Sequence, residues 1–233
     1  MSAFLDALRA RAAAGFVPVI PDFKMVSPAE GPLFAGRDPV DAAKAMAAAG
    51  APVLSVVTEK EHFGGSPALL REIAAAAGVP VLRKDFIRSV EDVEETAACG
   101  ASAVLLICAS MPEELLRRCR DAARDLGLEP LAEAHTAAEL RFAASLGCPL
   151  LGINNRDILA LEKDGGTVER TAALAGWKPP GAFLISESGL RSPDDVRRAV
   201  RSGADGVLVG TAIWRAADPF AFYDALSRAE AEA

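Results

Sequence analysis

Eight short apolar segments, each followed by a stretch that favours helix, constrain the fold of this 233-residue chain more than any other feature. The segments lack strict polar alternation, as expected for parallel strands covered on both faces. They are residues 17–23, 52–58, 79–83, 101–108, 128–134, 149–154, 181–186 and 205–210. Eight strand–helix units without a linker predict a closed (β/α)8 barrel, or TIM barrel, in which residues 1–233 form a single domain.

Local signals indicate where the intervening helices begin and end. Ser66 and Ser192 each precede a proline, which is typical of a helix start, and Thr136 with Glu139 has the spacing of a capping box. Six stretches end in a glycine suited to the left-handed residue after a helix: Gly50, Gly78, Gly100, Gly127, Gly147 and Gly203. An open doubly wound sheet is the alternative, but the G-x-G-x-x-G motif that would favour it after the first strand does not occur.

Charge and cysteine content exclude several classes of protein. The chain has 25 basic and 32 acidic residues, a net charge of −7, so we expect neither nucleic acid nor a membrane surface as a partner. The four cysteines form no C-x-x-C pair and the two histidines join none of them at metal-ligand spacing, so we expect reduced thiols, no metal site and a cytoplasmic protein.

Residues 1–16 precede the first strand segment and are predicted to form a short helical extension. Asp6 and Arg9 interrupt its apolar stretch, which argues against a signal peptide or a membrane span. Phe4, Leu5 and Leu8 form an apolar face that either caps the bottom of the barrel or folds over its mouth.

Polar residues follow the carboxyl ends of the strand segments, where barrels of this type carry their catalytic residues. Glu133 is the most unusual, because it stands inside a strand segment, where an unpaired buried carboxylate costs several kcal/mol. Lys84 and Arg156 are also candidate site residues. The alternative for each is an ion pair with a neighbouring carboxylate that has only a structural role. His135, two residues beyond Glu133, is interpreted as a loop residue.

Three strings, PVLRKDF at 80–86, GINNRD at 152–157 and SESG at 186–189, resemble the indole-3-glycerol-phosphate synthase family in order and spacing. The resemblance extends from about residue 17 to residue 215. It implies a lyase of tryptophan or related indole biosynthesis. Such an enzyme closes the pyrrole ring of 1-(2-carboxyphenylamino)-1-deoxyribulose 5-phosphate with loss of CO2 and water, using no metal or organic cofactor.

The resemblance also assigns roles to residues. It makes Lys84 the principal general acid, Glu133 the carboxylate that exchanges a proton with the substrate, and Lys24 a second acid or a carboxylate-binding residue. Ring closure on a ketone needs an acid at the carbonyl oxygen, and rearomatisation needs a base, so these residue types suit the chemistry. The remaining catalytic candidates are Asp22, Glu187 and Asn154.

Substrate-binding candidates come from the same comparison. Arg156 and Ser188 would orient the substrate, Ser27 would touch its carboxylate, and Phe63 and Phe86 would flank its aromatic ring. Ser27 as a helix cap and the two phenylalanines as packing residues are the alternatives. The backbone N–H groups of three residues would bind phosphate, with turn formation as the alternative: Gly189, Gly210 and Thr211.

Asp22 departs from the pattern, because the family string has glutamate at this position. The missing methylene shortens the side chain by about 1.3 Å, and misplacing a catalytic group by about 1 Å can cost on the order of 10²-fold in rate. From the sequence alone we favour a faster reaction when the methylene is restored in Asp22→Glu. The alternative is that the loop carrying Lys24, Met25 and Val26 has moved inward to suit aspartate, so that the longer side chain overpacks the site and lowers activity.

Two other functions remain open at this point. One is another phosphate-binding barrel enzyme, either an isomerase or a lyase that forms a Schiff base on Lys84. The other is a weakly active paralogue that acts as a binding barrel. Under each of these hypotheses the partner is a phosphorylated small molecule and the chain is a monomer or a weak homodimer.

Overall fold

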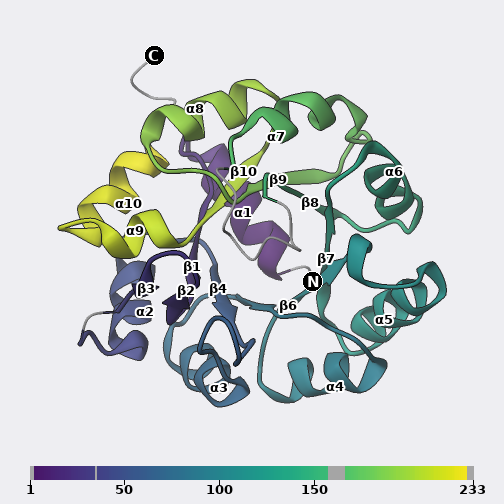
Figure 1. Ribbon diagram of the computed structural model, residues 1–233, viewed down its shortest axis with the longest axis horizontal. Helices are drawn as coiled ribbons and strands as arrows, with labels where there is room; N and C mark the ends of the chain where they lie inside the picture. The colour runs from purple at the N-terminus through teal and green to yellow at the C-terminus, as the bar shows by residue number, and fades with distance from the viewer. Residues whose placement is uncertain (1–2, 35, 157–165, 230–233) are drawn as a thin grey trace.

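The computed structural model of the protein describes residues 3–34, 36–156 and 166–229. Within them, eight parallel strands close a barrel in the order β1-β10-β9-β8-β7-β6-β5-β4 (Figure 1). The strands are β1 (Val19–Phe23), β4 (Leu54–Val57), β5 (Val81–Lys84), β6 (Ala103–Ile107), β7 (Glu129–Ala134), β8 (Leu150–Asn154), β9 (Phe183–Glu187) and β10 (Gly206–Val209). Because β1 pairs with both β4 and β10, the barrel is closed. The predicted TIM barrel is confirmed, and the open-sheet alternative is wrong.

Helices form a ring around the barrel (Figure 1). They are α2 (Pro39–Ala48), α3 (Pro67–Ala76), α4 (Val90–Ala98), α5 (Glu113–Asp125), α6 (Ala137–Ser145), α7 (Glu169–Leu174), α8 (Pro193–Arg201), α9 (Thr211–Arg215) and α10 (Pro219–Ser227), with 3-10 turns η1 (Cys108–Ser110) and η3 (Ala175–Trp177). A small antiparallel hairpin after β1, formed by β2 (Val26–Ser27) and β3 (Gly31–Pro32), was not evident from the sequence.

Most of the predicted helix boundaries are confirmed. Ser66 and Ser192 cap α3 and α8, and all six predicted glycines have positive φ. The capping box at Thr136 is only half formed, because the Glu139 carboxylate accepts the backbone N–H of His135 instead of that of Thr136. A complete box occurs at Ser89, which begins α4.

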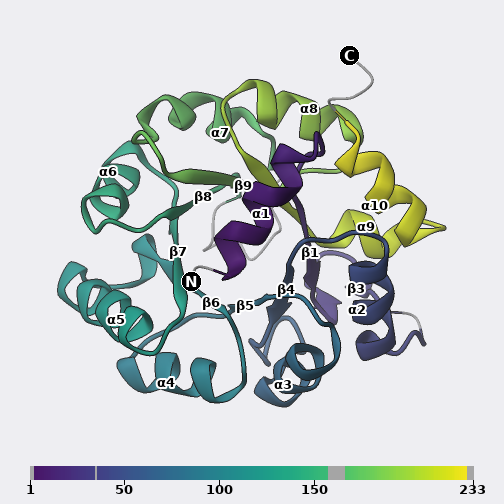
Figure 2. The same ribbon diagram turned by 180° about the vertical axis from the view of Figure 1, so that it is seen from behind.

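The N-terminal helix α1 (Ala3–Ala13) closes the bottom of the barrel, opposite the carboxyl ends of the strands (Figure 2). Phe4, Leu5 and Leu8 are buried among apolar residues from the first half of several strands, including Leu131. The Glu129 carboxylate accepts hydrogen bonds from the N–H groups of Phe4 and Leu5 at 2.7 and 3.0 Å. Of the two placements open to the extension, the structure therefore has the bottom cap.

Two further observations concern the chemical class of the protein. All four cysteines lie in the described part of the chain and are free thiols, as predicted. Among the described helices there is no span of the length and hydropathy that crossing a membrane requires.

Candidate active site

Four strands follow one pattern along their inward face. Side chains two residues apart on a strand point the same way, so an apolar residue in the lower barrel is followed by an ionisable one at the mouth. The pairs are Ile20 and Asp22, Leu82 and Lys84, Leu131 and Glu133, and Ile185 and Glu187, and the first member of each belongs to the apolar cluster that packs on α1. The alternation thus separates an apolar core near α1 from a layer of charged residues at the carboxyl ends of the strands.

Two adjoining cavities are lined by residues of this charged layer and of the loops that follow the strands. The carboxyl ends of the strands face the viewer in Figure 1. The first cavity is lined by aromatic and apolar side chains together with acids and bases. The second is lined by glycines and arginines together with apolar residues, lysines and acids. Five predicted site residues line both cavities: Asp22, Lys24, Lys84, Arg156 and Ser188. The two cavities therefore share one set of charged groups and form one continuous site.

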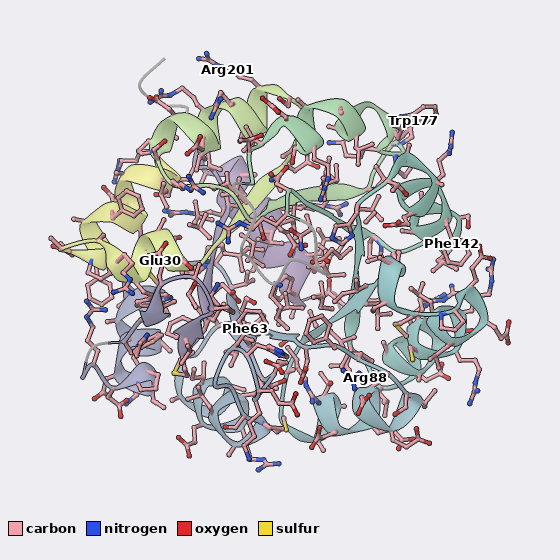
Figure 3. All side chains as sticks on the ribbon, viewed as in Figure 1. Glu30, Phe63, Arg88, Phe142, Trp177 and Arg201 are labelled. Carbon is pink, nitrogen blue, oxygen red and sulfur yellow. The ribbon has the colours of Figure 1, made fainter. Side chains whose placement is uncertain are left out.

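The first cavity has an aromatic wall. Phe63 and Phe86 line it, and the Lys24 ammonium lies 5.6 Å from the centroid of the Phe63 ring. Figure 3 shows Phe63 nearer the barrel centre than Glu30, which lines only the second cavity. Asn154 also lines the first cavity, and its Oδ1 accepts the backbone N–H of Arg156 at 3.0 Å. A flat apolar ring with a polar edge fits this wall.

The second cavity combines backbone turns with arginine side chains. Gly189, Gly210 and Thr211 line it, at the ends of β9 and β10. Ser188 and Gly189 both have positive φ, 64° and 74°, and Ser188 is the one non-glycine residue of the described chain in that region. Arg191 and Arg215 line the same cavity and were not among the predicted site residues, although their sequence positions just beyond SESG and Thr211 signalled them.

Asn155 holds the turn at Ser188 in place. Its buried Nδ2 group donates to Ser186 Oγ and to the carbonyl oxygens of Glu187 and Ser188, each at 3.0 Å. Its Oδ1 accepts from both the N–H and the hydroxyl of Thr171 on α7. Neighbouring residues of a strand face opposite ways, so Asn154 serves the cavity while Asn155 fixes the wall behind it.

Glu133 and Glu187 lie beside each other, fully buried beneath the cavities. Burial raises the pKa of Glu187 well above its usual range, the Glu133 charge raises it further, and the Lys84 ammonium opposes the rise. Gly152 on β8 makes room for the pair, because a Cβ there would stand 2.1 Å from Glu187 Oε1. One carboxyl group of such a pair tends to hold a proton at neutral pH.

Asp22 is tied to the barrel wall. Ser55 of β4 donates its hydroxyl to Asp22 Oδ1 at 2.6 Å, and both residues are buried. Trp214 donates its indole N–H to the Asp22 carbonyl oxygen at 2.7 Å. The aspartate is thus held by residues from two other parts of the chain.

Ser27 is placed differently from the other candidates. It lies in β2, is buried, and does not line either cavity. Its backbone carbonyl accepts the N–H of Glu30. The structure thus brings the other lining candidates together around the mouth, with Glu133 and Glu187 just beneath, and leaves Ser27 in the hairpin beside them.

Glu59 lines the first cavity and was also not selected from the sequence. It lies with Glu61 and His62 in a group whose ligand atoms are all within 4.8 Å of one another. The Glu59 carboxylate accepts the backbone N–H groups of Glu61, His62 and Phe63. Burial opposes ionisation, but these bonds prevail and lower the pKa of Glu59, so the group organises the loop that carries Phe63.

Comparisons with known proteins identify the family of the chain. The chain matches the family described as indole-3-glycerol phosphate synthase over residues 1–226. It is 45% identical over 201 residues to the indole-3-glycerol phosphate synthase of Nocardioides sp., covering 86% of this chain and 76% of the relative. It is 44% identical over 203 residues to that of Pyrococcus furiosus, covering 87% and 88%.

A solved structure with low sequence identity supports the fold alone. Thiamine phosphate pyrophosphorylase from Pyrococcus furiosus superposes with a TM-score of 0.69 at 16% identity, covering 93% of this chain and 96% of that one. The family match and the two relatives carry the assignment further than the fold can. Because it matches the family over residues 1–226 and is 44–45% identical to these two relatives, the chain belongs to the indole-3-glycerol phosphate synthase family.

Proposed function

We propose that the two joined cavities convert 1-(2-carboxyphenylamino)-1-deoxyribulose 5-phosphate into indole-3-glycerol phosphate, with loss of CO2 and water. The observation that carries this proposal is the set of acids and bases between an aromatic wall and an arginine-lined cavity. The substrate has the same order of parts: an aromatic ring, a reacting ketone and a phosphate.

Lys84 is the general acid for ring closure. It ends β5, lines both cavities and lies close enough to Glu187 for its charge to lower the pKa of that carboxyl. A protonated lysine there can donate to the ketone oxygen as the aromatic carbon attacks. Lys24 follows β1, which β4 alone separates from β5 around the barrel, and it is the second acid that protonates the hydroxyl leaving as water.

Glu133 takes or returns a proton beside Lys84, and Glu187 holds the proton that keeps the pair from carrying two charges. Asp22, anchored on Ser55, assists the dehydration step near Lys24. Each proton transfer then has a group of suitable type within the charged layer.

The phosphate occupies the second cavity. Backbone N–H groups at Gly189, Gly210 and Thr211 and the guanidinium of Arg156 bind it, since arginine can grip a phosphate with two parallel hydrogen bonds. Ser188 and Asn154 orient the middle of the substrate, and Phe63 and Phe86 flank its aromatic ring. Ser27 acts indirectly, by shaping the hairpin that follows Lys24.

The test is a steady-state assay with the carboxyphenylamino-deoxyribulose phosphate, followed by indole fluorescence. We expect turnover by the wild type and a loss of roughly 10²–10⁴-fold in Lys84→Ala, the usual contribution of a general acid. Glu133→Gln should lower kcat far more than it changes KM. Exposed Lys44 offers the matched control, Lys44→Ala, which should retain wild-type rates.

Other outcomes would identify another function. A wild-type enzyme without turnover, but with phosphate-dependent binding of the substrate, would make the chain a binding barrel. Borohydride inactivation that requires substrate and Lys84 would instead indicate a Schiff-base enzyme.

We further propose that residues 1–233 act as one domain in the cytoplasm, as a monomer or a weak homodimer without metal or organic cofactor. The free cysteines support a reducing compartment. Light scattering across a concentration series measures the oligomeric state, and a stable higher oligomer would contradict the proposal.

A further inference from the structure

His135 stands between the buried carboxylate of the site and a carboxylate at the surface. Its Nε2 is 3.6 Å from Glu133 Oε1, and its Nδ1 is 3.6 Å from Glu139 Oε2. The His135 side chain is 10% exposed, that of Glu133 is 0% exposed and that of Glu139 is 24% exposed. The three side chains thus form a line from the interior to the solvent.

Neither ring nitrogen of His135 makes a hydrogen bond to any residue that the structure describes, and both nitrogens are buried. Buried polar groups in proteins almost always have partners, and one without a partner needs an explanation. Glu139 approaches the ring because its Oε2 accepts the His135 backbone N–H at 2.7 Å. The same contact that leaves the capping box at Thr136 incomplete therefore places a carboxylate beside Nδ1.

We propose that His135 is a positioning residue that relays protons between Glu139 at the surface and Glu133 in the site. The inference rests on the proposed function. Loss of CO2 from a carboxylate consumes one proton per turnover, which the site must obtain from water. A substrate that fills both cavities covers the direct approach to the charged layer, whereas Glu139, on α6, remains partly accessible to solvent.

The transfer balances with the groups in this line. Nδ1 takes a proton from water through Glu139, giving an imidazolium between two carboxylates. The Nε2–H bond then breaks as an O–H bond forms on Glu133, which leaves the neutral ring protonated on Nδ1. Between turnovers, proton exchange with water removes the proton from Nδ1 and returns one to Nε2, and this restores the starting tautomer. At 3.6 Å both contacts must tighten slightly, as catalytic hydrogen bonds commonly do when substrate binds.

The other titratable groups around this line do not compete for the proton. Cys108 of η1 lies near Glu133 and Glu139. Burial raises the pKa of its thiol to about 12, so the thiol stays neutral. Glu187 of β9 and Lys84 of β5 act on the Glu133 end of the line. His135 is therefore the one imidazole among the described residues that contacts both Glu133 and Glu139.

The kinetic test compares His135→Gln and Glu139→Gln with Glu114→Gln, which replaces an exposed glutamate on α5. We expect His135→Gln to lower kcat by about 10- to 100-fold, as loss of a supporting partner commonly does, with KM within about twofold. The pH dependence of kcat should lose one ionisation, and imidazole should partly restore the rate of His135→Ala. Glu139→Gln should show a smaller loss, and Glu114→Gln none.

A second measurement does not depend on turnover. In His62→Gln protein His135 is the single imidazole, so NMR can follow its ring while pH is varied. We expect Glu133→Gln in this background to change the titration of the ring. An unchanged titration, or wild-type kcat in His135→Gln from pH 5.5 to 9, would overturn the relay. A loss of rate that imidazole does not restore, with an unaltered pH profile, would also overturn it. Failure of the proposed function would appear separately, as a wild type without turnover.

Discussion

Asp22 shows how strongly the surroundings of a residue decide the effect of one methylene. The sequence alone suggests that the aspartate is too short. In the structure its carboxylate accepts a 2.6 Å bond from Ser55, and a Cβ added at Gly210 would lie 3.3 Å from Oδ2. The Asp22 side chain is thus closely packed against the barrel wall. A longer side chain can be accommodated only if it gives up the hydrogen bond with Ser55.

These contacts reverse the sign expected for Asp22→Glu. We expect kcat to fall by roughly tenfold, because the added methylene breaks the Ser55 bond and moves the carboxylate by about 1 Å toward the lysines. Steady-state and single-turnover rates measure this effect. Ser55→Gly combined with Asp22→Glu makes space for the longer side chain and should recover part of the rate. A faster Asp22→Glu enzyme would show that the aspartate is not fitted to its site.

At the scale of elements, the strand–helix units form largely from local signals, but α1 depends on a distant partner. Its first turn is held by Glu129, which is 125 residues from Phe4 in the sequence. The carboxylate acts as an external cap for backbone N–H groups that a helix cannot satisfy itself. The cap lies at the end of β7 opposite Glu133, so stability and chemistry occupy opposite ends of one strand.

We expect Glu129→Ala to lower the free energy of unfolding by about 1–3 kcal/mol, because it leaves two backbone N–H groups without their acceptor. Its kcat should stay near that of wild type, since the substitution is at the bottom of the barrel. Urea unfolding and the steady-state assay measure the two effects. Glu129→Gln keeps an acceptor oxygen and should lose less stability. Equal stability of Glu129→Ala and wild type would mean that the apolar face alone holds α1.

At the scale of the whole molecule, the charged mouth reduces stability. Burial and the Glu133 charge raise the pKa of Glu187, so the folded state holds this proton more tightly than the unfolded chain does. The favourable contribution is complete below the ordinary pKa of glutamate, about 4.3, and is lost as pH rises toward the higher pKa of the folded state. The wild type should therefore be less stable at pH 8 than at pH 5 on account of this group.

Glu187→Gln should remove this loss of folding stability at high pH. We expect the variant to be more stable than wild type at pH 8, by roughly 0.5–2 kcal/mol, or about 2–4 °C in Tm for each kcal/mol. The difference should shrink at pH 5, where both side chains are neutral. Glu114→Gln, at an exposed position of α5, controls for the change in net charge. A variant no more stable than wild type at pH 8 would show that Glu187 is ionised at little cost.

Local sequence patterns account for the eight strands, the helix ends and most of the residues that line the barrel mouth. These features depend on local physics: apolar runs form covered strands, serines and glycines end helices, and a spacing of two places Lys84 and Glu133 on the inward face above Leu82 and Leu131. Family strings then added the candidate roles of residues at the strand ends.

Only the tertiary structure decided which distant groups meet. It placed α1 at the bottom of the barrel, Ser55 on Asp22, Ser27 in the hairpin beside the cavities, and the His135 ring between two glutamates. None of these contacts follows from a local pattern, because each depends on the closure of the barrel or on a side-chain direction beyond the end of a strand. Burial, which sets the charge of Glu187, exists only once the strands have closed around it.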